Sequence, residues 1–272
     1  DEFASRAKVI HIDIDPAEVG KNRVPEVPIV GDVKKVLTEL LRRCEERNIK
    51  QAPQQTQEWL NLINRWKEDY PLVIPHYADS ISPQEVIDEI GRQAPYAYYT
   101  TDVGQHQMWA AQFLKNGPRR WISSAGLGTM GFGVPAAMGV KVAFPDEDVI
   151  CISGDASFQM NLQELGTLAQ YGINVKTVII NNGWQGMVRQ WQQAFFGERY
   201  SNSNMEVGMP DIELLCQAYG IKGMVIENRE QLKDGIAEAI AHDGPVVVNA
   251  LVTKNENCYP MVAPGKSNSQ MI

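Results

Sequence analysis

Two apolar runs that each end in polar residues are the most informative feature of the 272-residue sequence. The first run starts at Val149 and ends in Gly154-Asp155, and the second ends in Asn181-Asn182. A helical pattern separates them, as in two parallel strands joined by a helix. Because both strands of such a unit end at the same edge of the sheet, we expect Asp155 and Asn182 to meet there, where open α/β sheets bind ligands.

These side chains are suited to holding a hard cation. One carboxylate oxygen, one amide oxygen and a backbone carbonyl leave room for the phosphate oxygens and waters that usually complete the shell of Mg²⁺. Gly154 allows a ligand to approach the backbone closely. Ala156 and Ser157 stand at the start of the next helix, a position that favours a phosphate. Either strand end alone is more often a structural turn, but their pairing in one unit favours the cation and the phosphate.

Alternating strands and helices are predicted from about residue 80 to the C-terminus. Strands are expected at 97–102, 119–123, 148–154, 174–181, 222–227 and 245–252. Helices are expected at 104–114, 131–143, 158–171, 184–195, 211–219 and 229–242, with a further helix start at Ser82-Pro83. Near-continuous Val/Ile strands alternating with helices predict an α/β fold, a doubly wound parallel sheet of about six strands with helices on both faces.

The first 50 residues contain too few elements for a domain. A strand is expected at 7–14 and a helix from Val33 to Arg47. The sequence opens on Asp1-Glu2-Phe3 and runs directly into the strand, which predicts a chain cut inside a larger protein. We therefore divide the chain into the end of a preceding α/β domain (1–50), a linker with a short helix (51–79) and the main domain (80–272).

Composition excludes several classes of function. The 25 Lys and Arg residues against 33 Asp and Glu residues give a net charge of −8, which argues against a nucleic-acid partner. No apolar run approaches the about 18–20 residues that span a bilayer, so no membrane partner is expected. The cysteines are scattered without a CxxC pair, which predicts reduced thiols in an intracellular compartment.

The spacing of Gly154-Asp155-Ala156 and Asn181-Asn182 resembles the thiamine-diphosphate signature, with Ala156 where that signature usually has a third Gly. Three further stretches, 103–112, 126–133 and 186–191, resemble the large subunit of acetohydroxyacid synthase (acetolactate synthase). Residues 3–22 resemble the end of that family's central domain. The resemblance covers nearly the whole chain and implies the thiamine-diphosphate-binding fold.

The resemblance implies a set of cofactor contacts. The implied Mg²⁺ ligands are Asp155, Asn182 and the backbone carbonyl of Trp184. The implied thiamine-diphosphate contacts are Gln105, His106, Gly128, Met130, Gly154, Ala156, Ser157, Gly186 and Met187. Among these, Gln105 and His106 would meet the diphosphate, the Gly128 carbonyl would meet the aminopyrimidine, and Met130 would support the bent cofactor.

A substrate pocket and part of a flavin site are also implied. Trp191, with Met187 and Val188, would shape the pocket for the second 2-keto acid, and Asp32 and Val33 would contact FAD.

Four of these residues have structural alternatives that the sequence leaves open. His106 could be a surface residue at a helix start, and Met130 could be simple packing. Trp191 follows Trp184 by a helical repeat and could face a core, and Asp32 could be a helix N-cap.

The resemblance implies decarboxylative condensation of two pyruvates, or of pyruvate with 2-ketobutyrate. The catalytic Glu of the family lies in an N-terminal pyrimidine-binding domain that is contributed across a dimer interface, and nothing in this chain matches it. We therefore assign no catalytic residue here and expect a homodimer or homotetramer with a small regulatory subunit. The sequence is compatible with a location in the bacterial cytoplasm and with one in the plastid stroma. The alternatives are a pyruvate oxidase, a glyoxylate carboligase, a 2-keto acid decarboxylase, or a non-catalytic binding module as the isolated chain.

Overall fold

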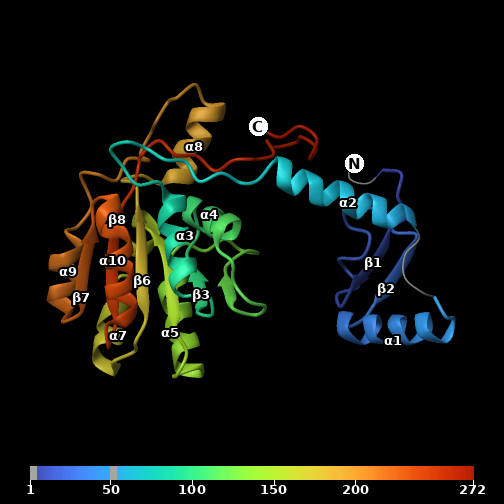
Figure 1. The fold of residues 1–272 in the computed structure, drawn as a ribbon, viewed down its shortest axis with the longest axis horizontal. Helices are drawn as coiled ribbons and strands as arrows, with labels where there is room; N and C mark the ends of the chain where they lie inside the picture. Colours follow the sequence, from blue (N-terminus) through green and yellow to red (C-terminus); the bar gives the residue numbers. More distant parts are fainter. Residues whose placement is uncertain (1–4, 50–53) are drawn as a thin grey trace. The chain divides into compact units, whose positions relative to one another are not determined.

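The computed structural model describes residues 5–49 and 54–272 and divides them into two compact units (Figure 1). The first unit comprises the described residues up to Pro71 together with Pro260–Ile272, and the second is Leu72–Tyr259. The sequence-based division at residue 80 stays a prediction. The opening residues 1–4 and the linker residues 50–53 lie outside the described part of the chain.

The second unit contains a sheet of six parallel strands in the order β4-β3-β5-β6-β8-β7. The strands are β3 (Tyr98–Thr101), β4 (Trp121–Ser123), β5 (Val149–Gly154), β6 (Lys176–Asn181), β7 (Lys222–Ile226) and β8 (Val246–Leu251). The helices are α3 (Pro83–Gln93), α4 (Gln105–Phe113), α5 (Gly133–Ala143), α6 (Asp155–Gln159), α7 (Glu164–Tyr171), α8 (Gly186–Phe195), α9 (Ile212–Tyr219) and α10 (Arg229–Ala241). The predicted fold class is confirmed.

Each face of this sheet builds its own apolar core. Alternate residues of a strand point to opposite faces, so Ile150 packs with α3, α4 and α10 while its neighbour Cys151 packs with α5, α7 and α9. In β8, Val246 and Val248 join the first core and Val247 joins the second. Burial on both faces explains why these strands are near-continuously apolar.

The structure differs from the prediction in two elements. The helix expected at 158–171 is interrupted: α6 starts directly at Asp155, and turns separate it from α7. In the interruption, Asn161 donates its side-chain amide to the Gly131 carbonyl at 2.7 Å, a tertiary contact that sequence periodicity does not reveal. The second difference lies in the first unit, where Val27–Val30 forms a strand that the prolines obscured.

The first unit pairs two short strands in parallel, β1 (Ile10–Asp13) and β2 (Val27–Val30), followed by α1 (Val33–Glu46) and α2 (Gln54–Asp69). Pro28 is tolerated because a proline on an edge strand need not donate to a ladder. No residue of α1 is buried, and its apolar residues Val33 and Leu41 are 55% and 65% exposed. Among the described residues, no helix has the length and apolar character needed to cross a membrane.

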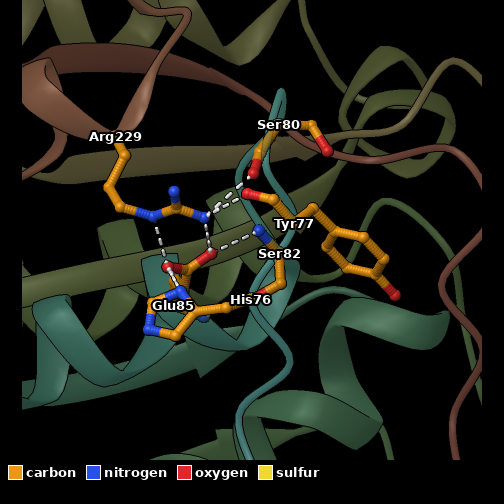
Figure 2. Close-up of polar contacts among 6 residues, drawn as sticks. All are labelled: His76, Tyr77, Ser80, Ser82, Glu85 and Arg229. Carbon is orange, nitrogen blue, oxygen red and sulfur yellow. Dashed lines mark hydrogen bonds and ion pairs between the residues drawn. The ribbon is translucent and has the colours of Figure 1, made fainter.

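An ion pair between the buried Glu85 and the partly exposed Arg229 fixes the start of the second unit (Figure 2). Ser82 and Glu85 form a reciprocal capping box at the start of α3. Arg229, at the start of α10, donates to Glu85 at 2.7 Å and to the backbone carbonyls of Tyr77 and Ser80. Burial by itself would raise the pKa of Glu85. The hydrogen bonds from Arg229 and Ser82 outweigh this effect, so the pKa of Glu85 is lowered. The segment before α3 is thereby tied to two helices.

Two glycines of α5 provide a matched test of this packing. A methyl group at Gly133 would lie 2.9 Å from the Asp102 amide nitrogen and from the Cys151 sulfur, whereas one at Gly139 would meet nothing within 4 Å. We expect Gly133→Ala to lower the free energy of unfolding by about 1–3 kcal/mol through overpacking. Gly139→Ala should raise it by about 0.5–1 kcal/mol through helix propensity. Urea denaturation measures both, and a similar effect at the two sites would contradict the packing around Gly133.

Candidate functional site

A cleft opens where the strand order of the sheet reverses. The chain passes from β3 outward to β4, then returns to the other side of β3 as β5 and continues to β6. The loops after β3 and β5 therefore diverge, which is where doubly wound sheets bind ligands. The cleft is lined by Val103, Gly104, Gln105, His106, Trp109, Met130, Gly154, Asp155, Ala156, Ser157, Ile180, Asn182, Trp184, Gln185, Gly186, Met187 and Val188.

Asp155 is a buried carboxylate with one oxygen left over. It is 3% exposed, and its Oδ1 accepts the Ala156 amide at 2.9 Å. Its Oδ2 is buried without a hydrogen-bond partner. Burial raises the pKa of Asp155 to about 7, although the amides of Ala156 and Gly183 oppose the shift. A buried carboxylate oxygen without a donor is costly, and a bound cation would remove that cost.

The loop after β6 carries the two other predicted ligands. Asn182 is buried, and its Oδ1 accepts the Trp184 amide at 3.0 Å. Gly183 has a φ of +72°, which permits the sharp turn. The segment after α8 holds this turn, because the Gly183 carbonyl accepts from Met205 and the Gln185 amide donates to Ser203, both at 2.8 Å. Neither of these two hydrogen bonds uses the Trp184 carbonyl oxygen.

His106 is buried at the first turn of α4 and is not a surface residue. It is 5% exposed, and burial lowers its pKa to about 3, so the imidazole is neutral. Its Nε2 is buried without a hydrogen-bond partner. The ring packs on the backbone of β5, since a methyl group at Gly154 would lie 2.7 Å from His106 Nδ1. The imidazole therefore leaves no room for a side chain at position 154.

The remaining cleft residues differ in whether their side chains already have hydrogen-bond partners within the protein. Ser157 is 1% exposed, and its hydroxyl accepts the Gly154 amide at 3.1 Å, so its side chain is engaged locally. The Gln105 amide nitrogen donates to Gln190 at 2.8 Å and to the Glu256 carbonyl at 3.3 Å, which uses both of its hydrogens. Gln105 therefore offers a ligand its backbone rather than its side-chain amide.

Four predicted residues do not line the cleft. Gly128 lies in the exposed loop beside it, with its amide bonded to the Ser124 carbonyl. Trp191 is half-buried on α8 and meets Phe195 edge to face, with ring centroids 4.9 Å apart. Asp32 and Val33 belong to the first unit, where Asp32 accepts the Lys35 amide at 3.0 Å as the N-cap of α1.

Asp102 is a buried residue that the sequence reasoning missed. Its Oδ1 accepts the amides of Val103 at 3.0 Å and Gly131 at 2.7 Å, and its Oδ2 accepts from Ser153. Burial raises its pKa, against the opposing effect of these amides. The bond to Gly131 holds the loop that brings Met130 into the cleft. A carboxylate at the last position of the strand predicted at 97–102 was the available signal.

The donor set fits a divalent cation that is shared with a phosphate. The described residues contain no group of three or more His, Cys, Asp or Glu side chains that could enclose a metal ion. A cation at Asp155 would therefore have one carboxylate and neutral oxygens from the protein, as Mg²⁺ does when substrate phosphates complete its shell. The orphaned atoms Asp155 Oδ2 and His106 Nε2 are two buried polar groups that a cation and a phosphate would satisfy.

Comparison with known families decides which ligand this cleft is built for. The family model described as "Thiamine pyrophosphate enzyme, C-terminal TPP binding domain" matches residues 102–250, which include every residue that lines the cleft. The chain belongs to the thiamine pyrophosphate enzymes. The central-domain model of the same enzymes matches residues 1–40. Thiamine diphosphate is thus the cofactor that this family's C-terminal domain binds.

Among these enzymes the chain is similar to acetolactate synthases. It is 60% identical over all 272 residues to the large subunit of Porphyra purpurea and 55% identical to the acetolactate synthase of Arthrospira platensis. The large subunit of Mycobacterium tuberculosis is 48% identical over 278 aligned residues. The chain covers 46%, 47% and 45% of these relatives, so it spans about half the length of the curated relatives that it matches.

The contact between Gly154 and His106 is open to a direct test. Gly154→Ala would push the imidazole away, so we expect the affinity for thiamine diphosphate with Mg²⁺ to fall about tenfold or more. The free energy of unfolding should fall by about 1–3 kcal/mol. Fluorescence titration and urea denaturation measure the two effects, with Gly139→Ala as the control away from the cleft. Unchanged cofactor affinity in Gly154→Ala would show that His106 has no part in binding.

Proposed function

We propose that this chain is the C-terminal part of an acetolactate synthase catalytic subunit. The complete enzyme joins two pyruvates, with loss of CO₂, into 2-acetolactate, or joins pyruvate with 2-ketobutyrate, in branched-chain amino acid biosynthesis. The observation that carries this proposal is the 60% identity to an acetolactate synthase large subunit along the entire chain. Pyruvate oxidases, glyoxylate carboligases and 2-keto acid decarboxylases are the alternatives within the thiamine pyrophosphate enzymes.

In this proposal the chain binds and orients the charged end of the cofactor. When bound, thiamine diphosphate supplies the electron sink on which a 2-keto acid loses its carboxyl group. Asp155, Asn182 and the Trp184 carbonyl hold Mg²⁺, supported by the orphaned oxygen of Asp155. The start of α4, with Gln105 and His106, meets the diphosphate, as does the turn at Ala156.

The remaining assignments concern the other end of the cofactor and the substrates. The Gly128 carbonyl meets the aminopyrimidine, while Met130, Gly186 and Met187 support the cofactor. The location of Met130, Gly186 and Met187 in the cleft wall supports this role. Val188, also in the wall, and Trp191 shape the pocket for the second 2-keto acid.

The proposal requires residues beyond this chain. The catalytic Glu and most of a flavin site belong to the N-terminal half of the family, and FAD contacts from Asp32 and Val33 would be a minor part of that site. The exposed apolar residues of α1 support this, because Leu37, Leu40 and Leu41 are 45%, 51% and 65% exposed and would pack in a complete central domain.

The remaining parts of the proposal are its partners and its location. The complete enzyme is a homodimer or homotetramer that acts on 2-keto acids with a small regulatory subunit. Relatives come from red algae and from bacteria. Plastid stroma and bacterial cytoplasm are the corresponding locations that we propose.

An activity assay on the 272-residue chain tests this division of labour. We expect no detectable acetolactate with saturating Mg²⁺ and thiamine diphosphate, because loss of a general acid–base alone costs about 10²–10⁴-fold. Activity should return when the N-terminal half of the Porphyra purpurea relative is supplied, in trans or covalently. The matched control is Asp155→Ala in the reconstituted enzyme, which should retain no cofactor. Full turnover by the chain alone would place the catalytic base within these residues.

The role of Trp191 can be separated from packing. If Trp191 shapes the acceptor pocket, Trp191→Leu should reduce the preference for 2-ketobutyrate over pyruvate by about 10–200-fold, the usual value of one methylene contact. Product analysis with mixed substrates measures this preference. The alternative is that the indole only packs against Phe195. In that case the variant would unfold at a lower temperature with its product ratio unchanged.

A further inference from the structure

A continuous chain of side-chain amides runs behind the cleft, from the C-terminal segment of the second unit to Asn182. We infer that Gln190 is a positioning residue, which fixes the orientation of the Gln105 amide and through it presents the oxygen, and not the nitrogen, of Asn182 to the cation. This inference rests on the proposed cation site and names a residue behind it that contacts neither cofactor nor substrate.

The orientation of Gln190 is set by backbone groups. Gln190 is fully buried on α8. Its Oε1 accepts the Cys258 amide at 2.9 Å and its Nε2 donates to the Cys258 carbonyl at 3.0 Å. A backbone N–H can only donate and a backbone C=O can only accept, so the Gln190 amide has a single orientation that satisfies both.

This orientation determines that of Gln105. Because Gln190 Oε1 is an acceptor, the Gln105 atom 2.8 Å away must be the donor Nε2. A second acceptor, the Glu256 carbonyl, lies 3.3 Å from the same nitrogen. The Gln105 oxygen consequently lies on the other side, where it accepts Asn182 Nδ2 at 3.3 Å.

The last link sets Asn182. With its nitrogen engaged by Gln105, its Oδ1 occupies the opposite branch of the amide and accepts the Trp184 amide at 3.0 Å. An amide oxygen has a second lone pair, which is available to a cation. A reversed amide would offer hydrogens to the cation instead, which is repulsive. Backbone groups stand at both ends of this series of hydrogen bonds, those of Cys258 at one end and the Trp184 amide at the other. Both ends require the same orientation of the amides between them.

The 256–258 segment, from which this series of hydrogen bonds starts, is itself held in place. The Glu256 carboxylate accepts from the Tyr77 hydroxyl and from Gln84 Nε2. Burial, together with this contact, raises the pKa of Tyr77 to about 12. Tyr77 belongs to the segment that Arg229 and Glu85 tie to α3 and α10 (Figure 2). The 256–258 segment is therefore a fixed support for Gln190 and Gln105.

The proposal predicts a specific order among Gln190 variants. Gln190→Leu removes the acceptor and should raise the Mg²⁺ concentration needed for thiamine-diphosphate binding about 10–100-fold, the usual cost of losing a partner behind a metal ligand. Gln190→Glu keeps an acceptor toward Gln105, and its carboxyl, which burial keeps protonated, can still donate to the Cys258 carbonyl. This variant should therefore stay within about threefold of the wild type. Quenching of tryptophan fluorescence in the reconstituted enzyme, titrated with Mg²⁺ at saturating thiamine diphosphate, measures both.

Gln193→Leu is the matched control on the same helix. Gln193 accepts from Asn257 at 3.0 Å and so tethers the same C-terminal segment without a bond to Gln105. We expect its Mg²⁺ midpoint to stay within about twofold of the wild type. A purely structural role for Gln190 predicts the reverse order, because a buried carboxyl disturbs an interior more than leucine does. Gln190→Glu binding more weakly than Gln190→Leu would overturn the proposal.

A double-mutant cycle tests the orientation itself. Asn182→Asp has oxygens on both branches, so in that background Gln190→Leu should change the Mg²⁺ midpoint less than twofold. Equal penalties in the two backgrounds would also overturn the inference. The proposed function is tested separately, by identifying the product that the wild-type enzyme forms. A product other than acetolactate would remove that function while leaving the effect of Gln190 on Mg²⁺ to stand.

Discussion

The reversal of strand order between β3 and β5 is the constraint on which the site depends. In a parallel sheet every strand ends at the same edge, and only at a reversal do neighbouring loops part to leave a cleft. Val103–His106 and Gly154–Ser157 come from the two sides of this reversal. The loop after β6 adds Asn182. Residues from separate strands thus converge because of topology rather than because of local sequence.

The cleft contains polar atoms that are costly without a ligand. Asp155 Oδ2 and His106 Nε2 are buried and lack hydrogen-bond partners. Burial favours the neutral form of both side chains. It raises the pKa of Asp155 to about 7 and lowers the pKa of His106 to about 3. Unsatisfied buried groups in a stable fold point to a missing partner, and a cation with a phosphate would satisfy both.

The polar residues around the cleft form a layered arrangement. Those that face it are supported by amides and carboxylates that face away from it, as when Asp102 holds the Met130 loop and Gln190 holds Gln105. A hydrogen bond between fully buried groups allows little freedom of orientation, because a reversed amide leaves two partners unsatisfied. The precision of the site thus depends on residues that no ligand touches.

The sequence by itself determined the sheet, most of its helices and the meeting of Asp155 with Asn182. Apolar periodicity and strand ends are local patterns, and the edge of a parallel sheet follows from them. Only the tertiary structure decided that Gln190 and Cys258 support Gln105, that Asn161 interrupts the predicted helix, and that Trp191 stands outside the cleft. These contacts join residues far apart in the chain, and periodicity within a segment does not encode which distant partner a buried polar group will find.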